Sequence, residues 1–333
     1  MSIRVIKQGI ADSIQDTGRY GYQQLGINPG GAMDTIAAQT ANLLVGNHFS
    51  DAVIELHFPA SSFLFNKQRL IALSGADFSA SINDVSIPIN TPVIIQKNNT
   101  LQFKQNKIGA RCYMAVQDGF VIDKWLNSYS TNIKAKAGGF EGRYLLKQDE
   151  IDFRFTENYS NILHEKDCVL LPWHIDTKDL YSSGNSIRIL SGKEFQLLDD
   201  VSKNNLQSTF FSISSQSDRM GYRMKGEALR LENYQELIST GVTKGTVQLL
   251  PDGQLIILMA DHQTTGGYAR VAHVISADIP KLAQMNANEK IQFRLIELME
   301  AEHLLYQQQQ HLLQLQNALN FRLKAYLQQH GLH

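Results

Sequence analysis

Residues 255–270 read Leu-Ile-Ile-Leu-Met-Ala-Asp-His-Gln-Thr-Thr-Gly-Gly-Tyr-Ala-Arg. The first six residues form an apolar run that predicts a buried β-strand. The ten residues that follow place a carboxylate, an amide and two hydroxyls beside the pair Gly266-Gly267. Glycine permits positive φ and lets another group approach the main chain where a Cβ would block it. The stretch therefore predicts either a ligand-binding loop after a strand or a hairpin with a glycine tip.

The rest of the chain repeats this strand-and-turn pattern. Pro251-Asp252-Gly253 is a β-turn signal between two apolar runs. In the first half, short apolar runs recur at a spacing of roughly ten residues with turn residues and no helical pattern between them. The runs in both halves are Val53–Leu56, Phe63–Phe65, Leu70–Leu73, Val93–Ile95, Tyr113–Val116, Ile187–Leu190, Phe210–Ser214 and Val247–Leu250, and a further strand is expected at Ile3–Lys7. The pattern predicts a mainly β protein built as antiparallel sandwiches or barrels.

One helix is expected near the N-terminus. Ile36–Val45 is rich in alanine and has helical spacing of its apolar residues. Asp34 precedes this run as an N-cap candidate, and Gly46 follows it as a stop. Capping is the favoured interpretation of Asp34 over a catalytic role.

A second, longer helix is expected at the C-terminus. Leu298, Leu305, Leu312 and Leu319 recur every seven residues, with Tyr326 next in register. This spacing predicts an amphipathic helix of about thirty residues. Gln307–Gln310 is expected to form its solvated face. The leucine seam is expected to pack on its own domain or on a partner.

The length of 333 residues is that of about two domains at roughly 150 residues each. We expect an N-terminal β lobe at 1–185, a second β lobe at 186–295 and the amphipathic helix at 296–330. The polar, uneven residues 156–186 are expected to connect the two lobes.

Composition excludes several classes of protein. Lysine and arginine number 31 against 32 aspartate and glutamate residues, a formal net charge of −1, so no bulk charge favours nucleic acid or an anionic membrane. The two cysteines, Cys112 and Cys168, fit no metal or redox spacing. No apolar run approaches the roughly 18 residues of a membrane span, and Met1–Lys7 lacks the apolar core of a signal peptide. We expect a cytoplasmic protein.

The sequence has no recognisable metal or nucleophile motif. Its ten histidines form no HxxxH or Cys/His set, and there is no GxSxG elbow, P-loop or GxGxxG after a strand. His262 is expected to be structural or exposed. No metal site is therefore expected.

Polar, glycine-bearing loops carry the remaining chemistry. They lie at 16–34, 74–77, 138–143, 217–223 and 261–270, and four of them hold the arginines Arg19, Arg143, Arg219, Arg223 and Arg270. Arginine suits carboxylate or phosphate, and the N–H groups of glycine suit a developing oxyanion. Asp16, Asp218 and Asp261 are candidates to orient these arginines or to act as general bases. Any single pair also fits a structural ion pair, whereas the whole set favours a binding site.

Several of these motifs follow one another in the order seen in a known family. They are Gln15-Asp16-Thr17-Gly18-Arg19, Pro29-Gly30-Gly31-Ala32-Met33-Asp34, Ala41–Asn47, Leu73–Asp77, Ser217–Arg223, Asp261–Tyr268 and Ile275–Asp278. Over about residues 3 to 295 the chain resembles the biotin-dependent carboxyltransferase family, which includes allophanate hydrolase subunit 2-like proteins and the antagonist of a sporulation kinase inhibitor. The resemblance implies two linked cyclophilin-like β-barrel lobes, with the long C-terminal α-helix read above.

The resemblance also implies an activity and partners. It implies the C subunit of an ATP-dependent 5-oxoprolinase, a hydrolase that converts 5-oxo-L-proline, ATP and water to L-glutamate, ADP and phosphate. The B subunit, which is allophanate hydrolase subunit 1-like, would share a composite site with this chain, and the A subunit would complete the hetero-oligomer. ATP would be a co-substrate of the complex, and the chain alone would be inactive or nearly so. The chain has no Met-Lys-Met biotinylation site, so no covalently attached biotin is expected.

Two alternatives stay open. One is a regulatory binding protein that antagonises a kinase-inhibitor homologue, and the other is the carboxyltransferase component of a biotin-dependent, urea-type carboxylase. Both enzyme activities act on a cyclic or planar amide and must stabilise charge on its oxygen.

The candidate site residues follow from the matched loops. We assign Arg219 and Tyr222 to the substrate carboxylate or phosphate, and Asp261, Gln263 and Thr264 to the lactam. The loop at 29–34 would close the pocket. The catalytic candidates are Asp261, Gln263, Thr264 and Asp218, and the substrate-binding candidates are Arg219, Tyr222, Gly30, Gly31, Met33, Asp34, Thr265, Gly266, Gly267 and Arg19.

Overall fold

The computed structural model describes residues 2–155, 157–181, 184–232 and 237–332. By their contacts these residues divide into two compact units. The first unit holds the described residues of Met1–Gly18, Asp34–Thr177 and Gln310–His333, and the second those of Arg19–Met33 and Lys178–Gln309. The glycine-rich segment Arg19–Met33 thus packs with residues far along the chain. The domain boundaries predicted at 185 and 295 remain predictions.

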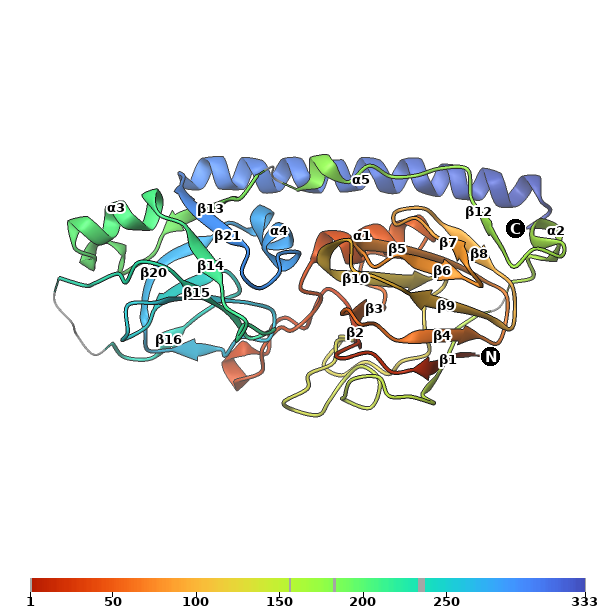
Figure 1. Cartoon of the computed structure of the whole chain (residues 1–333), viewed down its shortest axis with the longest axis horizontal. Coiled ribbons are helices and arrows are strands. Elements are labelled where there is room, and N and C mark those ends of the chain that lie inside the picture. The colour runs from red at the N-terminus through yellow and green to blue at the C-terminus, as the bar shows by residue number, and fades with distance from the viewer. Residues whose placement is uncertain (1, 156, 182–183, 233–236, 333) are drawn as a thin grey trace. The chain divides into compact units, whose positions relative to one another are not determined.

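The first unit is a β-sandwich of two six-stranded sheets (Figure 1). One sheet runs in the order β11 (Glu150–Asp152), β1 (Ser2–Lys7), β4 (Ser62–Phe65), β9 (Asn99–Phe103), β6 (Ala80–Ile82) and β7 (Val85–Ser86). The other runs in the order β12 (Cys168–Leu170), β8 (Val93–Ile95), β5 (Arg69–Asp77), β10 (Ile108–Val116), β3 (Val53–Leu56) and β2 (Ser13–Gln15). All the pairings between these strands are antiparallel.

Successive side chains along each strand of the sandwich point alternately into the shared core and away from it. Ile54 and Leu56 of β3 join Phe63 and Phe65 of β4 in the shared core, which both sheets fill. Residues at even and odd positions of a strand face opposite sides. Glu55 therefore lies on the face away from that core, although its side chain is fully buried.

Helix α1 (Thr35–Leu44) lies against β5 and β10 of the second sheet. Asp34 is its N-cap, because the side chain accepts a 2.9 Å hydrogen bond from Ala37 N. Gly46, at φ +78°, follows the helix in the left-handed conformation that glycine favours. Both predictions about the helix ends are confirmed.

The second unit is built on a closed seven-stranded barrel. Its order is β13 (Ser186–Ser191), β20 (Ala269–Val274), β17 (Thr246–Leu249), β18 (Leu255–Leu258), β15 (Gly221–Lys225), β14 (Phe211–Ile213) and β21 (Lys290–Leu295). Among these described strands only β13 and β21 pair in parallel, and this pair closes the barrel. The predicted mainly β fold with a barrel is confirmed.

Shorter elements surround the barrel. They are the ribbon of β16 (Thr240–Gly241) and β19 (Thr265–Gly266), the helices α3 (Asp200–Ser208) and α4 (Ile279–Ala283), and the 3-10 turns at Gln23–Leu25, Lys178–Leu180, Phe195–Leu197 and Ser276–Asp278. Met33 inserts into the barrel core beside leucines and valines of the strands. The segment before α1 is thereby anchored to the second unit.

The long C-terminal helix is α5 (Leu298–Gln329), as predicted. Leu312 and Leu319 of the predicted seam are each 5% exposed, whereas Leu298 is 58% exposed. The interpretation of Gln307–Gln310 as wholly solvated is wrong at Gln308, because its Nε2 donates to Leu180 O at 2.7 Å and Ala277 O at 3.3 Å.

The segment predicted to connect the lobes, 156–186, also contributes short elements to the first unit in its described part. Helix α2 (Ser160–Leu163) forms there, and β12 pairs with β8 as an edge strand of the sandwich. β12 is apolar but only three residues long, which is too short to be recognised as a strand from its sequence. None of the helices in the described part of the chain combines the length and the hydropathy that a membrane span requires.

Candidate functional site

The stretch that follows β18 forms a short ribbon and not a tight hairpin. Thr265 and Gly266 pair with Gly241 and Thr240, and Val242 N donates to Thr264 O at 3.0 Å. Neither Gly266 nor Gly267 has a positive φ. Gly266 leaves room for the Gln248 amide instead, because a Cβ at this position would lie 2.6 Å from Gln248 Nε2 and the amide would have to shift.

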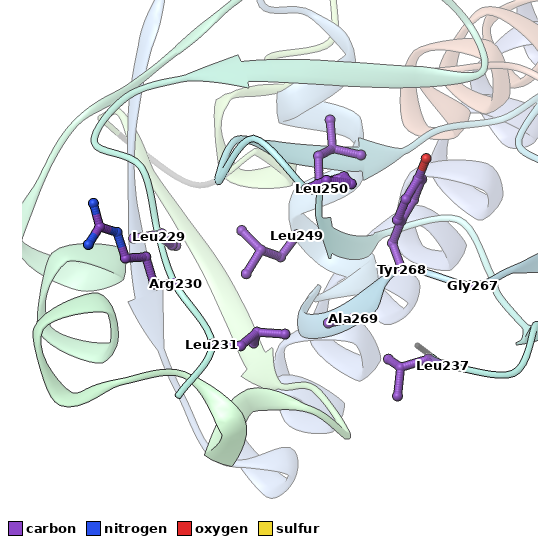
Figure 2. Close-up of a pocket in the computed structure, with 10 residues that line it drawn as sticks. Leu229, Arg230, Leu231, Leu237, Leu249, Leu250, Gly267, Tyr268 and Ala269 are labelled. Atoms are coloured by element: carbon purple, nitrogen blue, oxygen red, sulfur yellow. The ribbon is translucent and has the colours of Figure 1, made fainter. Parts of the chain in front are cut away.

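An apolar cavity of about 250 Å³ lies beside this ribbon (Figure 2). Its lining is mostly aliphatic, with Tyr268 and Arg230 as the polar exceptions: Leu229, Arg230, Leu231, Leu237, Leu249, Leu250, Pro251, Gly267, Tyr268 and Ala269. An apolar cavity of roughly 150 Å³ is enough to bind benzene, so this one can hold a small organic molecule.

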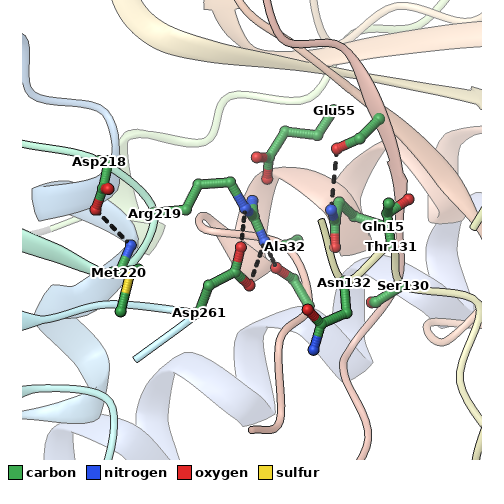
Figure 3. Close-up of polar contacts among 12 residues, drawn as sticks. Gln15, Ala32, Glu55, Ser130, Thr131, Asn132, Asp218, Arg219, Met220 and Asp261 are labelled. Atoms are coloured by element: carbon green, nitrogen blue, oxygen red, sulfur yellow. Dashed lines mark hydrogen bonds and ion pairs between the residues drawn. The ribbon is translucent and has the colours of Figure 1, made fainter. Parts of the chain in front are cut away.

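The predicted partners Arg219 and Asp261 form a buried ion pair (Figure 3). Arg219 Nε lies 2.8 Å from Asp261 Oδ2, and Nη2 lies 3.2 Å from Oδ1. The main chains are also joined, since Asp261 N donates to Arg219 O at 2.8 Å. The side chains are only 9% and 16% exposed, so solvent screens the pair weakly.

Arg219 also holds the glycine-rich segment. Its Nη2 donates to Gly31 O at 2.7 Å, and Lys244 Nζ donates to Ala32 O and Met33 O at 3.2 and 3.0 Å. Three successive carbonyl groups thus bind cationic side chains. A main chain held in this way is fixed relative to Asp261.

Arg19 lies at the same place. Its side chain is almost fully buried, and its main-chain N donates to Pro29 O at 2.7 Å. A Cβ on Gly30 would lie 2.9 Å from Arg19 Nη1 and 3.7 Å from Asp261 Oδ1. Gly30 and Gly31 both have positive φ, at +63° and +90°. Glycine favours the backbone conformation at both positions, and at Gly30 it also leaves room for the Arg19 guanidinium group.

The structure therefore brings part of the predicted site together within the second unit. Arg19, Gly30, Gly31, Arg219 and Asp261 form one cluster. Arg19, Arg219 and Lys244 place cationic side chains around the Gly30-Gly31 loop. Such an arrangement is suited to binding a carboxylate or phosphate group.

Other predicted residues lie at different places. Asp218 is exposed and accepts from Met220 N at 2.8 Å and Gly221 N at 3.2 Å, which is the geometry of a turn. Gln263, Thr265 and Gly267 are exposed, and Thr264 is half-buried. Met33 and Tyr222, at most 2% exposed, belong to the barrel core, so their contact with substrate remains a prediction.

His262, next to Asp261, is buried, and its Nδ1–H donates to the carbonyl of Gln263. Burial, with the charge of Lys244 nearby, lowers the pKa of His262. The ring is therefore neutral near pH 7 and carries its lone pair on Nε2.

Asp34 belongs to the first unit, where its main chain is part of a separate hydrogen-bond network with Tyr113 and Glu55. Its main-chain N donates to Tyr113 Oη at 2.8 Å, and Tyr113 Oη donates to Glu55 Oε2 at 2.8 Å. Burial raises the pKa of Tyr113 well above its usual value. The phenol thus stays protonated and bridges the acid to the start of α1.

Asp16 of the first unit is also structural. It accepts from Gly18 N at 2.7 Å, Tyr129 N at 2.6 Å and Ser128 Oγ at 2.8 Å, and from the hydroxyl of Ser130. These contacts tie the loop after β2 to the loop at 128–130. Each of these donors in the described part of the chain is a main-chain amide or a serine hydroxyl, which does not support the hypothesis that Asp16 orients an arginine.

Sequence reasoning missed four buried or half-buried polar residues. Lys244 and Gln248 lie in the second unit, and Glu55 and Tyr113 in the first. Glu55 could have been recognised from the sequence, because it is an acid inside an apolar strand. Lys244 could not, because a Thr-Lys-Gly turn is common on protein surfaces. The described residues hold no group of three or more His, Cys, Asp or Glu side chains placed to bind a metal ion.

Comparison with known proteins identifies the family. A family model described as "Carboxyltransferase domain, subdomain A and B" matches residues 25–295. The chain belongs to this carboxyltransferase-domain family. It is 34% identical to the C subunit of 5-oxoprolinase from Escherichia coli K12, covering 90% of this chain and 93% of that protein. It is 35% identical to the C subunit of 5-oxoprolinase from Haemophilus influenzae, covering 88% of this chain and 90% of that protein.

The family fold is also seen in a solved structure. The crystal structure of urea carboxylase from Kluyveromyces lactis superposes with a TM-score of 0.85 at 24% identity. The match covers 94% of this chain and 29% of that one. As a member of the carboxyltransferase-domain family, the chain shares this architecture.

Proposed function

We propose that this chain is the C subunit of an ATP-dependent 5-oxoprolinase, which converts 5-oxo-L-proline to L-glutamate with hydrolysis of ATP. The observation that carries the proposal is the match, over 90% or more of their length, to two proteins named as the C subunit of 5-oxoprolinase. The complex would contain the A and B subunits, ATP would be its co-substrate, and the chain alone would have little or no turnover.

The Arg219–Asp261 cluster has the chemistry for such a role. Attack on a lactam, or transfer of a phosphoryl group to its oxygen, builds negative charge that cationic groups and N–H donors stabilise. Arg19 and Lys244 would supply positive charge beside Gly30 and Gly31. Because Arg219 already binds Asp261 and Gly31 O, its first role would be to hold the loop and the carboxylate in place.

Gln263, Thr264 and Thr265 would contact the lactam from the ribbon, where their side chains are exposed or half-buried. Asp261 would steer a proton, as a carboxylate held by two nitrogen atoms of Arg219.

A second candidate is carboxyl transfer, which the description of the family favours. That function would require biotin on a separate carrier protein. It shares with the first the need to stabilise charge on an amide oxygen.

One experiment separates the candidates. The tagged chain is purified from its host with its partners, and release of glutamate from 5-oxo-L-proline is measured with and without ATP and avidin. ATP-dependent release that avidin leaves unchanged is the expected result. A stable complex without glutamate release would contradict the proposal, and inhibition by avidin would favour the carboxyltransferase.

A further inference from the structure

Gln248 is a fully buried glutamine whose amide makes no hydrogen bond to any described residue. Its exposed fraction is 0%, and neither Oε1 nor Nε2 has a partner within that part of the chain. Buried polar atoms are nearly always paired, because an unpaired one loses its bonds to water and gains nothing in return. Here both a donor and an acceptor are left unpaired on the same side chain.

The position of Gln248 on the barrel explains its surroundings. Its neighbours Val247 and Leu249 belong to the barrel core, and so do Ile257 and Leu255, which pair with them on β18. Gln248 pairs with Ile256, and alternation places both residues on the outer face of the barrel. A side chain on that face is normally solvated.

The β16–β19 ribbon is what covers it. A Cβ on Gly266 would lie 2.6 Å from Gln248 Nε2 and 3.5 Å from Oε1. The absence of a Cβ therefore lets the ribbon lie close to the amide without moving it. The ribbon has only two residues in each strand, and such a short pair has little stability of its own.

The ribbon borders the apolar cavity through the residue that follows Gly266. Gly267 lines the cavity of Figure 2, whereas Leu249, although next to Gln248 on β17, faces the barrel core on the opposite side of the strand. A small outward movement of Gly266 and Gly267 would open the space above Gln248 towards this cavity.

A primary amide has a distinctive complement. It presents a C=O acceptor and an N–H donor side by side, at the geometry of a cis amide. A lactam is a cis amide that presents the same pair in the opposite sense, so two parallel hydrogen bonds form between them. Trans amides and carboxylates present no such pair.

We propose that Gln248 is a specificity-determining residue that binds the cis-amide edge of a lactam when the β16–β19 ribbon lifts. The choice of a lactam rests on the proposed function. Gln248 Nε2–H donates to the lactam oxygen and Oε1 accepts from the lactam N–H. The ring methylenes face the aliphatic lining of the cavity. Thr264, Thr265 and Gly266, which the sequence marked as substrate-contacting, move with the ribbon.

The test uses two lactams and two matched variants. The full chain in its complex with the partner subunits is titrated with 2-pyrrolidone and with N-methyl-2-pyrrolidone by ligand-observed NMR. The methyl group removes the N–H and leaves the ring and the carbonyl. Wild type is expected to bind 2-pyrrolidone at least about tenfold more tightly, since one buried acceptor is left unpaired by the methylated ring. Equal affinity for the two lactams would overturn the proposal without any variant.

The variants are Gln248→Met and, as control, Gln292→Met. Gln292 lies on β21 and its Nε2 donates to Gln207 O at 2.9 Å, so its amide has a structural partner. Gln248→Met is expected to keep or raise the melting temperature and to weaken 2-pyrrolidone binding at least about tenfold. Gln292→Met is expected to lower the melting temperature and leave binding unchanged. A fall in melting temperature for Gln248→Met with unchanged binding would show that the amide is structural.

Failure of this inference and failure of the proposed function give different results. Glutamate release by wild type, with equal binding of both lactams, contradicts the role of Gln248 alone. Lactam binding that depends on Gln248, in a complex that releases no glutamate, contradicts the oxoprolinase proposal alone. In an active complex, Gln248→Met is expected to raise KM for 5-oxo-L-proline about tenfold with a smaller effect on kcat.

Discussion

Arg270 and Arg219 both pair with a carboxylate in the second unit, but they differ in what else each residue binds. Arg270 gives its main-chain N, Nε and Nη2 to Glu194, at 2.9, 3.0 and 2.7 Å. These three contacts all end on one acid beside its own strand. Arg219 divides its contacts between Asp261 and Gly31 O, the latter 188 positions away in the chain.

This contrast shows how similar loops acquire different roles. Both arginines lie in glycine-bearing loops of the sequence, but only Arg219 was assigned there to substrate binding. The hydrogen bonds that the Arg270 guanidinium donates to Glu194 raise the pKa of Arg270, and the pair connects β20 to the turn at Phe195–Leu197. Arg188 and Asp278 form a third pair of the same fastening kind, including Arg188 N to Asp278 Oδ2 at 2.7 Å. Of these three pairs, only that of Arg219 holds a glycine loop that matches the candidate site.

The largest expected effect is a loss of stability when the structural ion pair between Arg188 and Asp278 is broken. Asp278→Ala leaves Arg188, whose side chain is 17% exposed, without its counter-charge, and should lower the free energy of unfolding by about 3–5 kcal/mol. Urea denaturation measures the change. As a control, Glu300→Gln breaks the exposed pair with Arg294 and should cost less than about 1 kcal/mol. Similar losses for the two variants would mean that the Arg188 pair is not a main support of the barrel.

Asp12, a buried acid of the first unit, contrasts with these ion pairs because neutral main-chain donors hold it. Burial raises the pKa of Asp12 to about 6, against hydrogen bonds from His57 N and Ser61 N. The folded state therefore keeps a proton that the unfolded chain has released between about pH 4 and 6. The contribution of Asp12 to stability is fully present below about pH 4 and falls by about 3 kcal/mol as the pH rises past 6.

The measurement is the urea midpoint of wild type and Asp12→Asn from pH 4 to 7. Wild type should lose stability relative to Asp12→Asn as the pH rises. A constant difference across this range would show that Asp12 titrates at the same pH in both states.

On the functional side, the contrast between Arg219 and Arg270 predicts a loss of turnover. Arg219→Met should reduce turnover of 5-oxo-L-proline by the assembled complex about 100-fold, because the loop at Gly31 and the Asp261 carboxylate lose their common anchor. Arg270→Met removes the same group from a fastening pair and should change turnover less than about threefold at a temperature where it is folded. Equal losses in the two variants would remove Arg219 from the site.

The weakest effect should come from Asp34. Asp34→Ala removes the N-cap of α1 and should cost about 1 kcal/mol of stability, whereas Asp34→Asn keeps a capping oxygen for Ala37 N. Thermal unfolding and turnover are measured for both. If Asp34→Asn is as stable as wild type but loses turnover, the carboxylate has a role in the site beyond capping.

Elements with local causes could be predicted from the amino-acid sequence alone. Short apolar runs separated by turn residues predicted the strands, Asp34 and Gly46 marked the ends of α1, and the seven-residue leucine spacing predicted α5, because these signals depend on near neighbours. The order of the glycine-rich motifs was enough to identify the family. Residues such as Gln263 and Thr264 were found as candidates because their loop follows a buried strand.

The role of each polar residue emerged only from the folded chain. Asp16 and Asp261 stand in similar motifs, yet one accepts from serines and amides and the other binds Arg219. The assignment of Arg19–Met33 to the second unit and the coverage of Gln248 by Gly266 depend on residues that are distant in the sequence. Burial and partner choice are properties of such long-range contacts, and no local pattern of residues encodes them.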